Sequence, residues 1–429
     1  MIIGIVILFF LITLLLGMPV FFVLGLSSLL YFIMSNSLDF LPILIYRMFS
    51  GMDNFVLMAV PLFILTGEIM NRGNITNKLV EFANVLVGRF KGGLAYVNIL
   101  SSMFFAGITG SALSDVAALG SMLIPAMEKS GYDREFSTAV TAASAIQGPI
   151  IPPSIPAVLI AAVTGTSTGA LFLGGAIPGM VLGLSCCVVT YFLSNRRQYP
   201  TNKIRINFHS FVTLFLSAFF PLLTPLIILG GILGGIFTPT EAAAVAVLYA
   251  FVITILSKVK LNKEELMELF KVTILSTAKI YLIIGAASVF AWILAIENIP
   301  VLIADFLSSF SSNVYVTLFI INIFLLFWGM WMDTAPSIMI LMPLLYPIAT
   351  RIGIHPTHFG VIVLVNLMIG LLTPPFGMAL FSAQAIGKVS LKNLLRELKP
   401  FLIADFIVLG LVTFVPEISL YLPRLFGLI

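Results

Sequence analysis

Charge is scarce in this chain of 429 residues. Charged residues make up 9% of the sequence and hydrophobic residues make up 60%, whereas a soluble domain carries about 25% charged residues. A chain this apolar could not cover its surface with polar groups, so a soluble globular protein is excluded. The apolar runs are near-continuous rather than alternating, which argues against a transmembrane β-barrel. The sequence therefore predicts an all-α polytopic membrane protein.

Cysteine and histidine are also scarce, and this excludes several kinds of catalytic site. The two cysteines, Cys186 and Cys187, are adjacent in an apolar run, which provides neither a disulfide framework nor metal-ligand spacing. The histidines are His209, His355 and His358. No glycine-rich loop ends in Gly-Lys-Ser/Thr, so we do not expect ATP hydrolysis in this chain. We predict that the protein is not an enzyme and holds no resident cofactor.

Each half of the sequence contains two apolar segments that are too short or too broken to form one crossing helix. A crossing needs about 20 apolar residues at 1.5 Å each. In the first half, 94–127 consists of two short arms around GITGSALSD, and 135–167 is interrupted at QGPIIPPS. In the second half, 315–350 has arms around GMWMDTAPS, and 357–386 is interrupted at GLLTPPFG. We predict a re-entrant hairpin and a broken helix in each half, and a last span at about 400–421.

The hairpins and breaks repeat when the sequence is shifted by 222 residues, which places Gly148 over Gly370 and one Pro-Pro pair over the other. We predict two repeats, 1–194 and 211–429, joined by a polar linker at 195–210. Each repeat would hold five spans, one of them broken, and one hairpin. An odd number of spans inverts the second copy. Inverted repeats with paired breaks are typical of secondary transporters that bind their substrate near the middle of the membrane.

The distribution of basic residues predicts an orientation. If the linker lies in the cytoplasm, only Arg47, Arg351 and Arg424 remain on the outer side, which is the positive-inside pattern. The pattern holds only if each hairpin enters and leaves on one side. Both termini then face outside, the first hairpin opens from the cytoplasm, and the second opens from the outer side.

The hairpin tips and the helix breaks are the candidate binding sites. Backbone that leaves a helix inside the membrane is tolerated only within protein or beside a wet cavity. Free helix N-termini attract anions and free carbonyl groups attract cations. Oxygen ligands suit a small hard cation, and Na⁺ is favoured over H⁺ because we find no titratable relay at the tips and breaks. We therefore expect two sodium sites flanking one anionic substrate.

The candidate sodium ligands are Gly107, Thr109, Ser111, Gly148, Gly329, Asp333, Thr334 and Gly370. The candidate substrate-binding residues are Ser111, Ser114, Asp115, Pro153, Ser154, Thr373 and Pro375.

Some of these residues also have a purely structural interpretation. Ser111 and Asp333 can cap the second arm of each hairpin, and capping does not exclude ligation. Asp115 can equally serve as a first-turn partner of the helix dipole. The sequence Thr238-Pro-Thr-Glu241 has the spacing of a capping box with proline at the first helical position, so a cap is the favoured interpretation of Glu241.

Two further charged residues, Glu68 and Lys279, lie in apolar surroundings, where charge is costly. The sequence alone assigns neither of them a role.

At these motifs the sequence resembles the large membrane (M) subunit of tripartite ATP-independent periplasmic (TRAP) transporters. The resemblance covers essentially the whole chain. It is carried by PLFILTGEIM (61–70), GITGSALSDVAALGSMLIPAMEKSGY (107–132), GPIIPPSIPAV (148–158), GGIFTPTEAAAVAVLY (234–249), MDTAPSIMILMPLLYP (332–347) and GLLTPPFGMALF (370–381). The tips differ at one matched position, where Asp333 stands opposite Ser111, so the two cation sites need not be equivalent.

The resemblance implies Na⁺-driven uptake of an organic acid, such as a C4-dicarboxylate or a sialic acid, across a bacterial inner membrane. It implies a fold similar to that of the divalent-anion/sodium symporters, which move by an elevator mechanism. It also implies two partners, a small four-helix membrane (Q) subunit and a periplasmic substrate-binding protein. The competing hypothesis is an intramembrane lipid-modifying enzyme, for which His355 and His358 near Asp333 form the best constellation.

Overall fold

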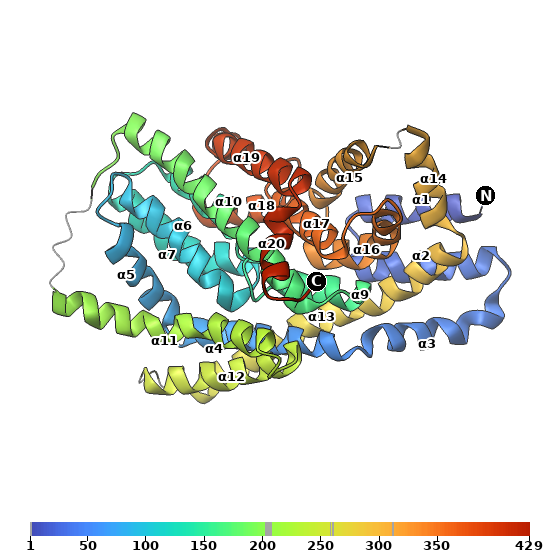
Figure 1. Ribbon diagram of the computed structural model, residues 1–429, viewed down its shortest axis with the longest axis horizontal. Helices are drawn as coiled ribbons and strands as arrows, with labels where there is room; N and C mark the ends of the chain where they lie inside the picture. Colours follow the sequence, from blue (N-terminus) through green and yellow to red (C-terminus); the bar gives the residue numbers. More distant parts are fainter. Residues whose placement is uncertain (1, 202–207, 258, 260, 311–312) are drawn as a thin grey trace.

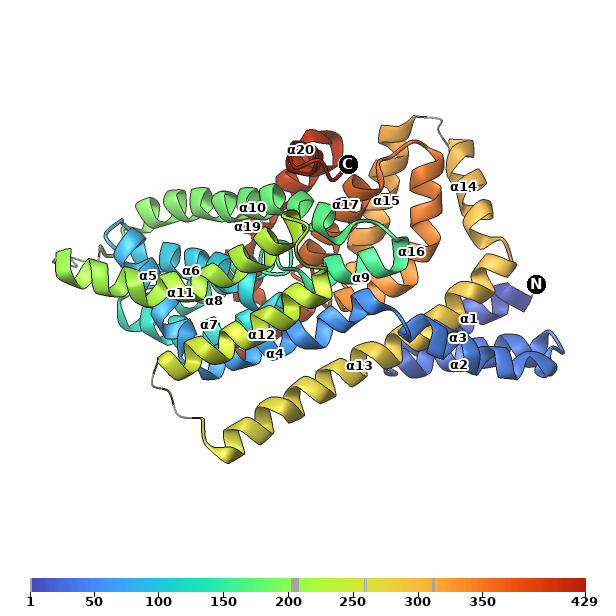
Figure 2. The same cartoon turned by 60° about the horizontal axis from the view of Figure 1, so that its bottom comes forward.

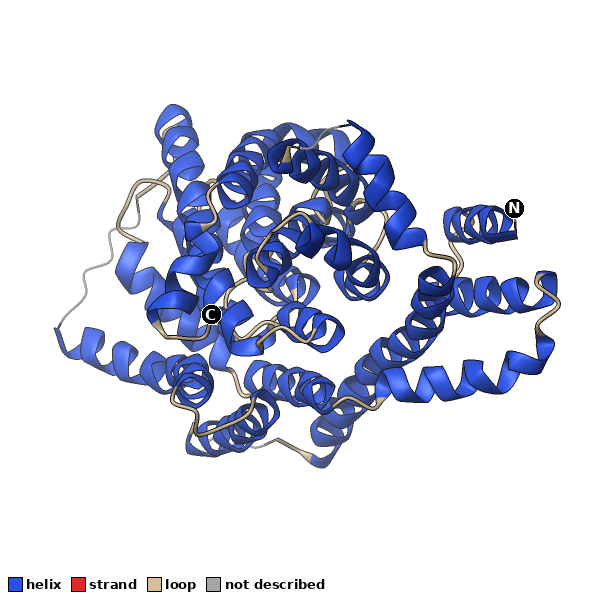
Figure 3. Cartoon of the chain, turned by 45° about the vertical axis from the view of Figure 1, so that its right-hand side comes forward, coloured by secondary structure: helices blue, strands red, loops and turns tan. Residues whose placement is uncertain are grey.

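The computed structural model describes residues 2–201, 208–257, 259, 261–310 and 313–429. Over these residues the chain is helical, with one isolated bridge between Lys91 and Thr201 (Figures 1 and 3). The predicted all-α fold class is therefore confirmed for the described residues. Within the predicted linker at 195–210, residues 202–207 lie outside the described part, as does the side chain of His209.

The helices follow one another along the chain with short connections. Those before the linker are α1 (Ile2–Leu15), α2 (Val20–Met34), η1 (Leu38–Phe40), α3 (Leu41–Met52), η2 (Phe55–Met58), α4 (Ala59–Arg72), α5 (Ile75–Val87), α6 (Gly93–Thr109), α7 (Ala112–Lys129), α8 (Arg134–Ala145), α9 (Ile155–Thr164) and α10 (Thr168–Arg197). Those after it are α11 (Phe208–Leu233), α12 (Pro239–Leu256), α13 (Lys263–Ile296), α14 (Ile299–Phe310), α15 (Val314–Gly329), α16 (Thr334–Arg351), α17 (Pro356–Gly370), α18 (Met378–Gly387), α19 (Leu391–Phe414) and α20 (Glu417–Leu425).

Length and apolar composition make several of these helices candidate membrane spans. Five described segments qualify: Phe55–Arg72, Thr168–Arg197, Phe211–Leu233, Pro239–Leu256 and Lys263–Ile296. The pair α19 and α20, bent by 58°, makes a sixth when it is taken as one span. Most other apolar helices have 10–17 residues, which is short for a crossing of about 20 residues. The protein is a multi-pass membrane protein in which breaks shorten many helices.

The helix ends fall where the sequence places the tips and breaks. Helix α6 ends at Gly110, which has a left-handed φ of +57° that favours glycine. Helix α8 ends at Ala145 and α9 begins at Ile155, after an intervening stretch of nine residues that contains the first Pro-Pro pair. Both Pro-Pro peptide bonds are cis. The re-entrant path of the hairpins stays a prediction.

Two expected helix boundaries differ from the structure. The last span, expected at 400–421, is a helix that begins at Leu391 and a second helix after Pro416. Proline has no backbone N–H to continue the helix.

The capping box at Thr238 and Glu241 is confirmed: the Thr238 N–H donates to Glu241 Oε2 at 2.8 Å, and the Glu241 N–H donates to Thr238 Oγ1 at 3.3 Å.

One side of the molecule is formed by helices α3, α4, α11, α12 and α13, which we call the lateral wall. These helices pack on one another in sequence-distant pairs, and α13 crosses the molecule along this side (Figure 2). The hairpins, the breaks and helices α10 and α19 lie together above the wall in Figure 1. We call this part, residues 93–197 and 314–414, the hairpin body.

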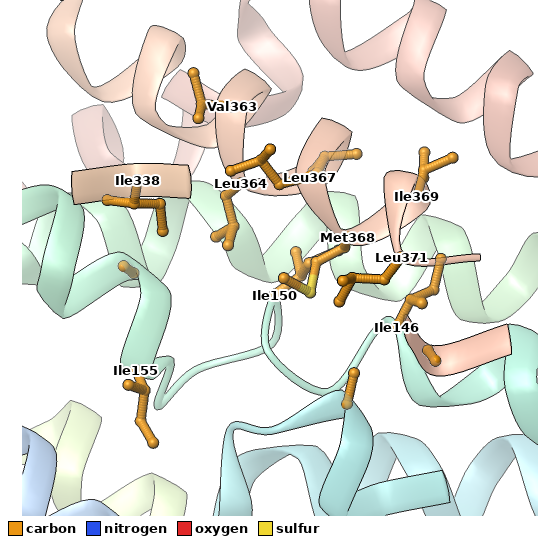
Figure 4. Close-up of a cluster of buried hydrophobic side chains, with 14 of the residues drawn as sticks. Ile146, Ile150, Ile155, Ile338, Val363, Leu364, Leu367, Met368, Ile369 and Leu371 are labelled. Carbon is orange, nitrogen blue, oxygen red and sulfur yellow. The ribbon is translucent and has the colours of Figure 1, made fainter. Parts of the chain in front are cut away.

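The centre of the hairpin body is apolar and fully enclosed. Ile150 from the first break lies in one buried cluster with Met368 and Leu371 from the second break region (Figure 4). Every residue of α17 from Thr357 to Gly370 is buried. The two breaks are therefore packed against each other, and the tips are held around them.

Candidate functional site

A cavity of about 770 Å³ lies between the hairpin tips and the lateral wall. The start of α7 and the start of α16 line it from the hairpin body, together with Ile155 at the start of α9. Helices α4 and α13 line it from the wall. Three helix N-termini therefore border one space, and helix N-termini favour anions through their free N–H groups and the helix dipole.

The first tip presents hydroxyl groups to this cavity. Ser111 is the N-cap of α7, and its Oγ accepts a bond of 3.4 Å from the Ser114 N–H. Both serines line the cavity. A bond of this length is weak, so the Ser111 hydroxyl retains acceptor capacity for a ligand. The side chain of Thr109, a predicted sodium ligand, lies outside the described residues.

The second tip presents a carboxylate at the matching position. Asp333 is the N-cap of α16, and its Oδ1 accepts a bond of 2.7 Å from the Thr334 N–H. Asp333 and Thr334 both line the cavity, and the buried Thr334 Oγ1 has no hydrogen-bond partner among the described residues. Capping occupies one lone pair of the carboxylate and leaves the rest of its acceptor capacity for a cation.

Each tip also touches a break directly. In the first half, a Cβ atom added at Gly110 would lie 3.3 Å from the Pro153 carbonyl oxygen, and one added at Gly107 would lie 3.3 Å from the Pro152 carbonyl oxygen. Asp115 and Gly148 also meet here, because a Cβ at Gly148 would lie 3.6 Å from Asp115 Oδ2. Five predicted residues of the first half therefore lie at or beside the contact between the first tip and the first break: Gly107, Ser111, Asp115, Gly148 and Pro153.

The second half repeats this contact with two glycines. A Cβ added at Gly370 would lie 2.8 Å from the Cα of Gly329, and one added at Gly329 would lie 3.2 Å from the Cα of Gly370. The backbones therefore approach more closely than any other residue type allows. The end of α15 and the end of α17 meet here, so backbone carbonyls at two helix ends are brought side by side.

Several predicted substrate ligands do not line the cavity. Ser154 is buried, and its hydroxyl is already hydrogen-bonded within the break, because it donates to the Pro149 carbonyl and accepts from the Ala157 N–H. The Thr373 hydroxyl donates to the Ile369 carbonyl at 2.8 Å. Pro153 lies in the tip and break contact, and Pro375 is exposed outside the cavity. These four residues shape the breaks in the conformation that the structure presents.

Asp115 also lies away from the cavity lining, although its position in the first turn of α7 matches the dipole interpretation. It is 1% exposed, no described group lies within 3.5 Å of either carboxylate oxygen in hydrogen-bonding geometry, and the hydroxyl of Ser102 is the polar side chain beside it. A buried carboxylate without a partner carries a large desolvation cost. This arrangement suits a cation held between the first tip and the first break.

The oxygen-rich contacts are compatible with Na⁺, which needs no histidine or cysteine ligand. Within the described ranges, no group of three or more His, Cys, Asp or Glu side chains could hold a metal ion. Hydroxyl, carboxylate and backbone carbonyl oxygens are the hard donors that an alkali cation accepts. Unpartnered oxygens at Asp115 and Thr334 provide one such donor beside each tip.

The histidine constellation proposed for an enzyme does not form. Neither His355 nor His358 lines the cavity that contains Asp333. His355 caps α17, where its ring accepts from the Thr357 N–H at 3.2 Å. His358 Nδ1 lies 2.6 Å from the Ser419 hydroxyl and is committed to that contact. Both rings therefore have structural roles at the start of α17.

Sequence reasoning missed the buried acid Asp405, and the structure adds detail at Gln147, Glu68 and Lys279, which the sequence already indicated as polar residues in apolar surroundings. Asp405 on α19 is fully buried, and both of its carboxylate oxygens lack a partner among the described residues. The Gln147 amide at the first break is also buried and unpartnered. For Asp405 the signal was an isolated acid within an apolar run, which is a site hypothesis by default. Glu68 and Lys279, left without a role, both line the cavity.

Comparison with known proteins places the chain among transport proteins. Residues 6–418 match the family described as "Tripartite ATP-independent periplasmic transporter, DctM component". The sialic acid TRAP transporter large permease protein SiaM of Vibrio cholerae is 43% identical over 96% of each chain. The C4-dicarboxylate TRAP transporter large permease protein DctM of Pseudomonas aeruginosa is 37% identical over 94% of each chain. These relatives are named as transporter permeases and not as enzymes.

The fold is also similar to that of a solved transporter. The crystal structure of the Alcanivorax borkumensis YdaH transporter, described as revealing an unusual topology, superposes with a TM-score of 0.60 at 15% identity and covers 88% of each chain. At this identity the similarity concerns the fold alone.

Proposed function

Because this chain belongs to the DctM component family of tripartite ATP-independent periplasmic transporters, we propose that it is the membrane permease for Na⁺-coupled uptake of an organic acid. The substrate class is a sialic acid or a C4-dicarboxylate, as the names of its relatives indicate for those proteins. The chain uses the Na⁺ gradient as its energy source and needs no other cofactor.

The convergence of two capped hairpin tips on one cavity carries this proposal. Ser111 of the first half and Asp333 of the second half each begin a helix whose N-terminus faces the same space. A carboxylate placed there meets free N–H groups and positive helix ends. The cavity volume of about 770 Å³ lies in the range of small-molecule sites.

The two sodium sites lie at the contacts between tips and breaks. The ligands at the first site come from Gly107, Ser111, Gly148 and the Asp115 carboxylate beside them. Those at the second come from Gly329, Asp333, Thr334 and Gly370. Bound sodium ions hold each tip against its break and neutralise the Asp333 carboxylate, so the substrate anion binds favourably only after the cations. This order couples the two fluxes.

We further propose that the two halves are inverted repeats and that the hairpin body moves as an elevator along the lateral wall. Buried side-chain hydrogen bonds at similar places in both halves support the repeat: Ser144 Oγ donates to Asn98 Oδ1 at 3.5 Å, and Asn366, which matches Ser144 at the shift of 222, donates from Nδ2 to Asn322 Oδ1 at 2.6 Å. Each bond joins the first hairpin arm to the helix before the break. The cavity supports the motion, because one of its faces belongs to the wall and the other belongs to the hairpin body.

The remaining parts of the proposal concern partners and location. A small four-helix membrane subunit binds the exposed apolar surface of this chain, and a periplasmic protein delivers the substrate. The chain lies in a bacterial inner membrane with the linker in the cytoplasm and both termini in the periplasm. The positive-inside distribution of basic residues supports this orientation.

The test is uptake by purified components in liposomes under an inward Na⁺ gradient. We expect labelled N-acetylneuraminate or malate to accumulate when this chain, the small subunit and the binding protein are all present. Omission of any one component should reduce uptake to the level of empty liposomes. Equal uptake without the binding protein would contradict the tripartite mechanism, and no uptake of either probe would contradict the proposed substrate class.

A further inference from the structure

A lysine lies in the middle of the longest helix of the lateral wall. Helix α13 has 34 residues, and Lys279 is about 25 Å from either end at 1.5 Å per residue. Lys279 lies within the apolar part of α13, eight residues beyond Lys271, which is the nearest other charged residue on this helix. A charge in such a segment is costly and faces protein or a water-filled space.

The space that Lys279 faces is the cavity of the candidate site. Five residues of α13 line it: Val272, Ser276, Lys279, Ile280 and Ile283. Lys279 and Ile280 are neighbours, and each is three or four residues from both Ser276 and Ile283, so these residues share one face of the helix. Lys279 therefore lies on the face of α13 that lines the cavity opposite the tips.

Lys279 forms an ion pair with neither of the two acidic residues that line the cavity. The other charged lining residues are Glu68 and Asp333. Glu68 forms an ion pair with Arg72, with 3.7 Å between Oε2 and Nε, and the proposed function gives Asp333 a sodium ion. No described residue forms an ion pair or hydrogen bond with Lys279. One positive charge thus remains for a bound anion.

We propose that Lys279 binds an anionic group of the substrate from the lateral wall, opposite the helix N-termini of the tips. This inference rests on the proposed function and adds a specific group of the substrate site. It also has a consequence for transport. In the proposed elevator the hairpin body moves and the lateral wall does not. Lys279 therefore contacts the anion only in the conformation in which the tips lie opposite this part of α13.

The experiment measures direct binding to the permease and small subunit in lipid nanodiscs. The probes are N-acetylneuraminate and malate, titrated by calorimetry in NaCl, together with the carboxamide of N-acetylneuraminate. The variants are Lys279→Gln and Lys279→Arg. The matched control is Lys271→Gln on the same helix, because Lys271 pairs with Glu268 at 3.6 Å and does not line the cavity. Na⁺-induced thermal stabilisation without any organic anion reports the sodium sites separately.

We expect Lys279→Gln to raise the dissociation constant of the acid probe by about tenfold or more, the order expected for loss of a charge-assisted hydrogen bond. Lys279→Arg should stay within about threefold of the wild type, since it keeps the charge. Lys271→Gln should change nothing, and Na⁺ should stabilise all variants equally.

Charge, rather than shape, must account for the loss. The neutral carboxamide should bind the wild type and Lys279→Gln with similar constants. A Lys279→Gln constant within twofold of the wild type, or an equal loss for acid and carboxamide, would overturn the role of Lys279 and leave the proposed function standing. Failure of the wild type to bind either acid would overturn both.

Discussion

At the scale of single residues, Ser111 and Asp333 occupy matching positions but hold their helices with different strength. The Ser111 hydroxyl accepts its capping bond at 3.4 Å, whereas the Asp333 carboxylate accepts its bond at 2.7 Å. Only Asp333 brings a formal charge to its tip. The two sodium sites of the proposal should therefore differ in their dependence on these side chains.

We predict that Asp333→Asn raises the Na⁺ concentration for half-maximal uptake by about tenfold or more, since it removes a charge from a partly buried cation site. Ser111→Ala removes one neutral ligand and a weak cap, and should raise it by less than about threefold. Both variants should reach the membrane in wild-type amounts. The measurement is uptake against Na⁺ concentration in the same liposome preparation.

The Na⁺ dependence of Asp333→Asn separates ligation from capping, and thermal unfolding of both variants shows whether the helix cap still stabilises the protein. Asparagine caps a helix about as well as aspartate, so a purely structural role predicts no effect of Asp333→Asn on Na⁺ dependence. Unchanged Na⁺ dependence for Asp333→Asn would therefore show that Asp333 is a cap and not a sodium ligand.

The sequence indicated the tip residues because serine or aspartate before an apolar helix is a local signal. It could not indicate which hydroxyls are already used within the breaks. Ser154 was an equally good candidate ligand, yet it bonds to Pro149 and Ala157. The burial of Asp405 depends on the packing of α19 against α8 and α10, which no local pattern encodes.

At the scale of elements, helix ends at the breaks were predictable, whereas the start of α13 and the presence of α3 were not. Glycine and proline mark the breaks directly. Helix α13 begins at Lys263, ahead of its continuous apolar run, where the Asn262 and Glu265 side chains form a capping box. Hydropathy undervalues this charged first turn, although the capping signal was present in the sequence. Helix α3 (Leu41–Met52) was not expected and packs on α13.

We predict that Gly370→Ala weakens the second sodium site by separating the second tip from its break. The new Cβ would meet the Gly329 backbone at 2.8 Å, and such overpacking costs about 1–3 kcal/mol. The expected result is a lower thermal midpoint and a higher Na⁺ concentration for half-maximal uptake.

The matched control for this change is Gly410→Ala on α19, where no atom lies within 4 Å of the added Cβ. It should keep wild-type transport and stability or gain slightly, because alanine favours helix. Wild-type Na⁺ dependence in Gly370→Ala would contradict a sodium site at this contact.

At the scale of the whole molecule, the proposed orientation in the membrane rests on the distribution of basic residues along the sequence. We predict that Asn313→Cys is labelled by a membrane-impermeant thiol reagent in intact cells and that Arg196→Cys is protected. Cys186 and Cys187 are first replaced by alanine so that only the new thiol reacts. The reverse pattern of labelling would contradict the orientation.

The proposed repeat rests on tips and breaks that recur at one spacing in the sequence, whereas no sequence pattern indicates which residues line the cavity. Lys279 faces the tips only through the packing of α13 and α4 beside them. Such contacts join segments far apart in the chain and depend on how the lateral wall meets the hairpin body. The sequence shows that Lys279 and Glu68 each lie among apolar residues, but it could not show that they line the same cavity.

The central claim is that a Na⁺ gradient drives accumulation of the organic acid. The most direct measurement uses liposomes containing the permease and small subunit, with the binding protein and labelled substrate outside. One sample has an inward Na⁺ gradient at equal pH, and the other has an inward proton gradient in Na⁺-free buffer. We predict accumulation above equilibrium only with the Na⁺ gradient. Equal accumulation driven by protons without Na⁺ would contradict it.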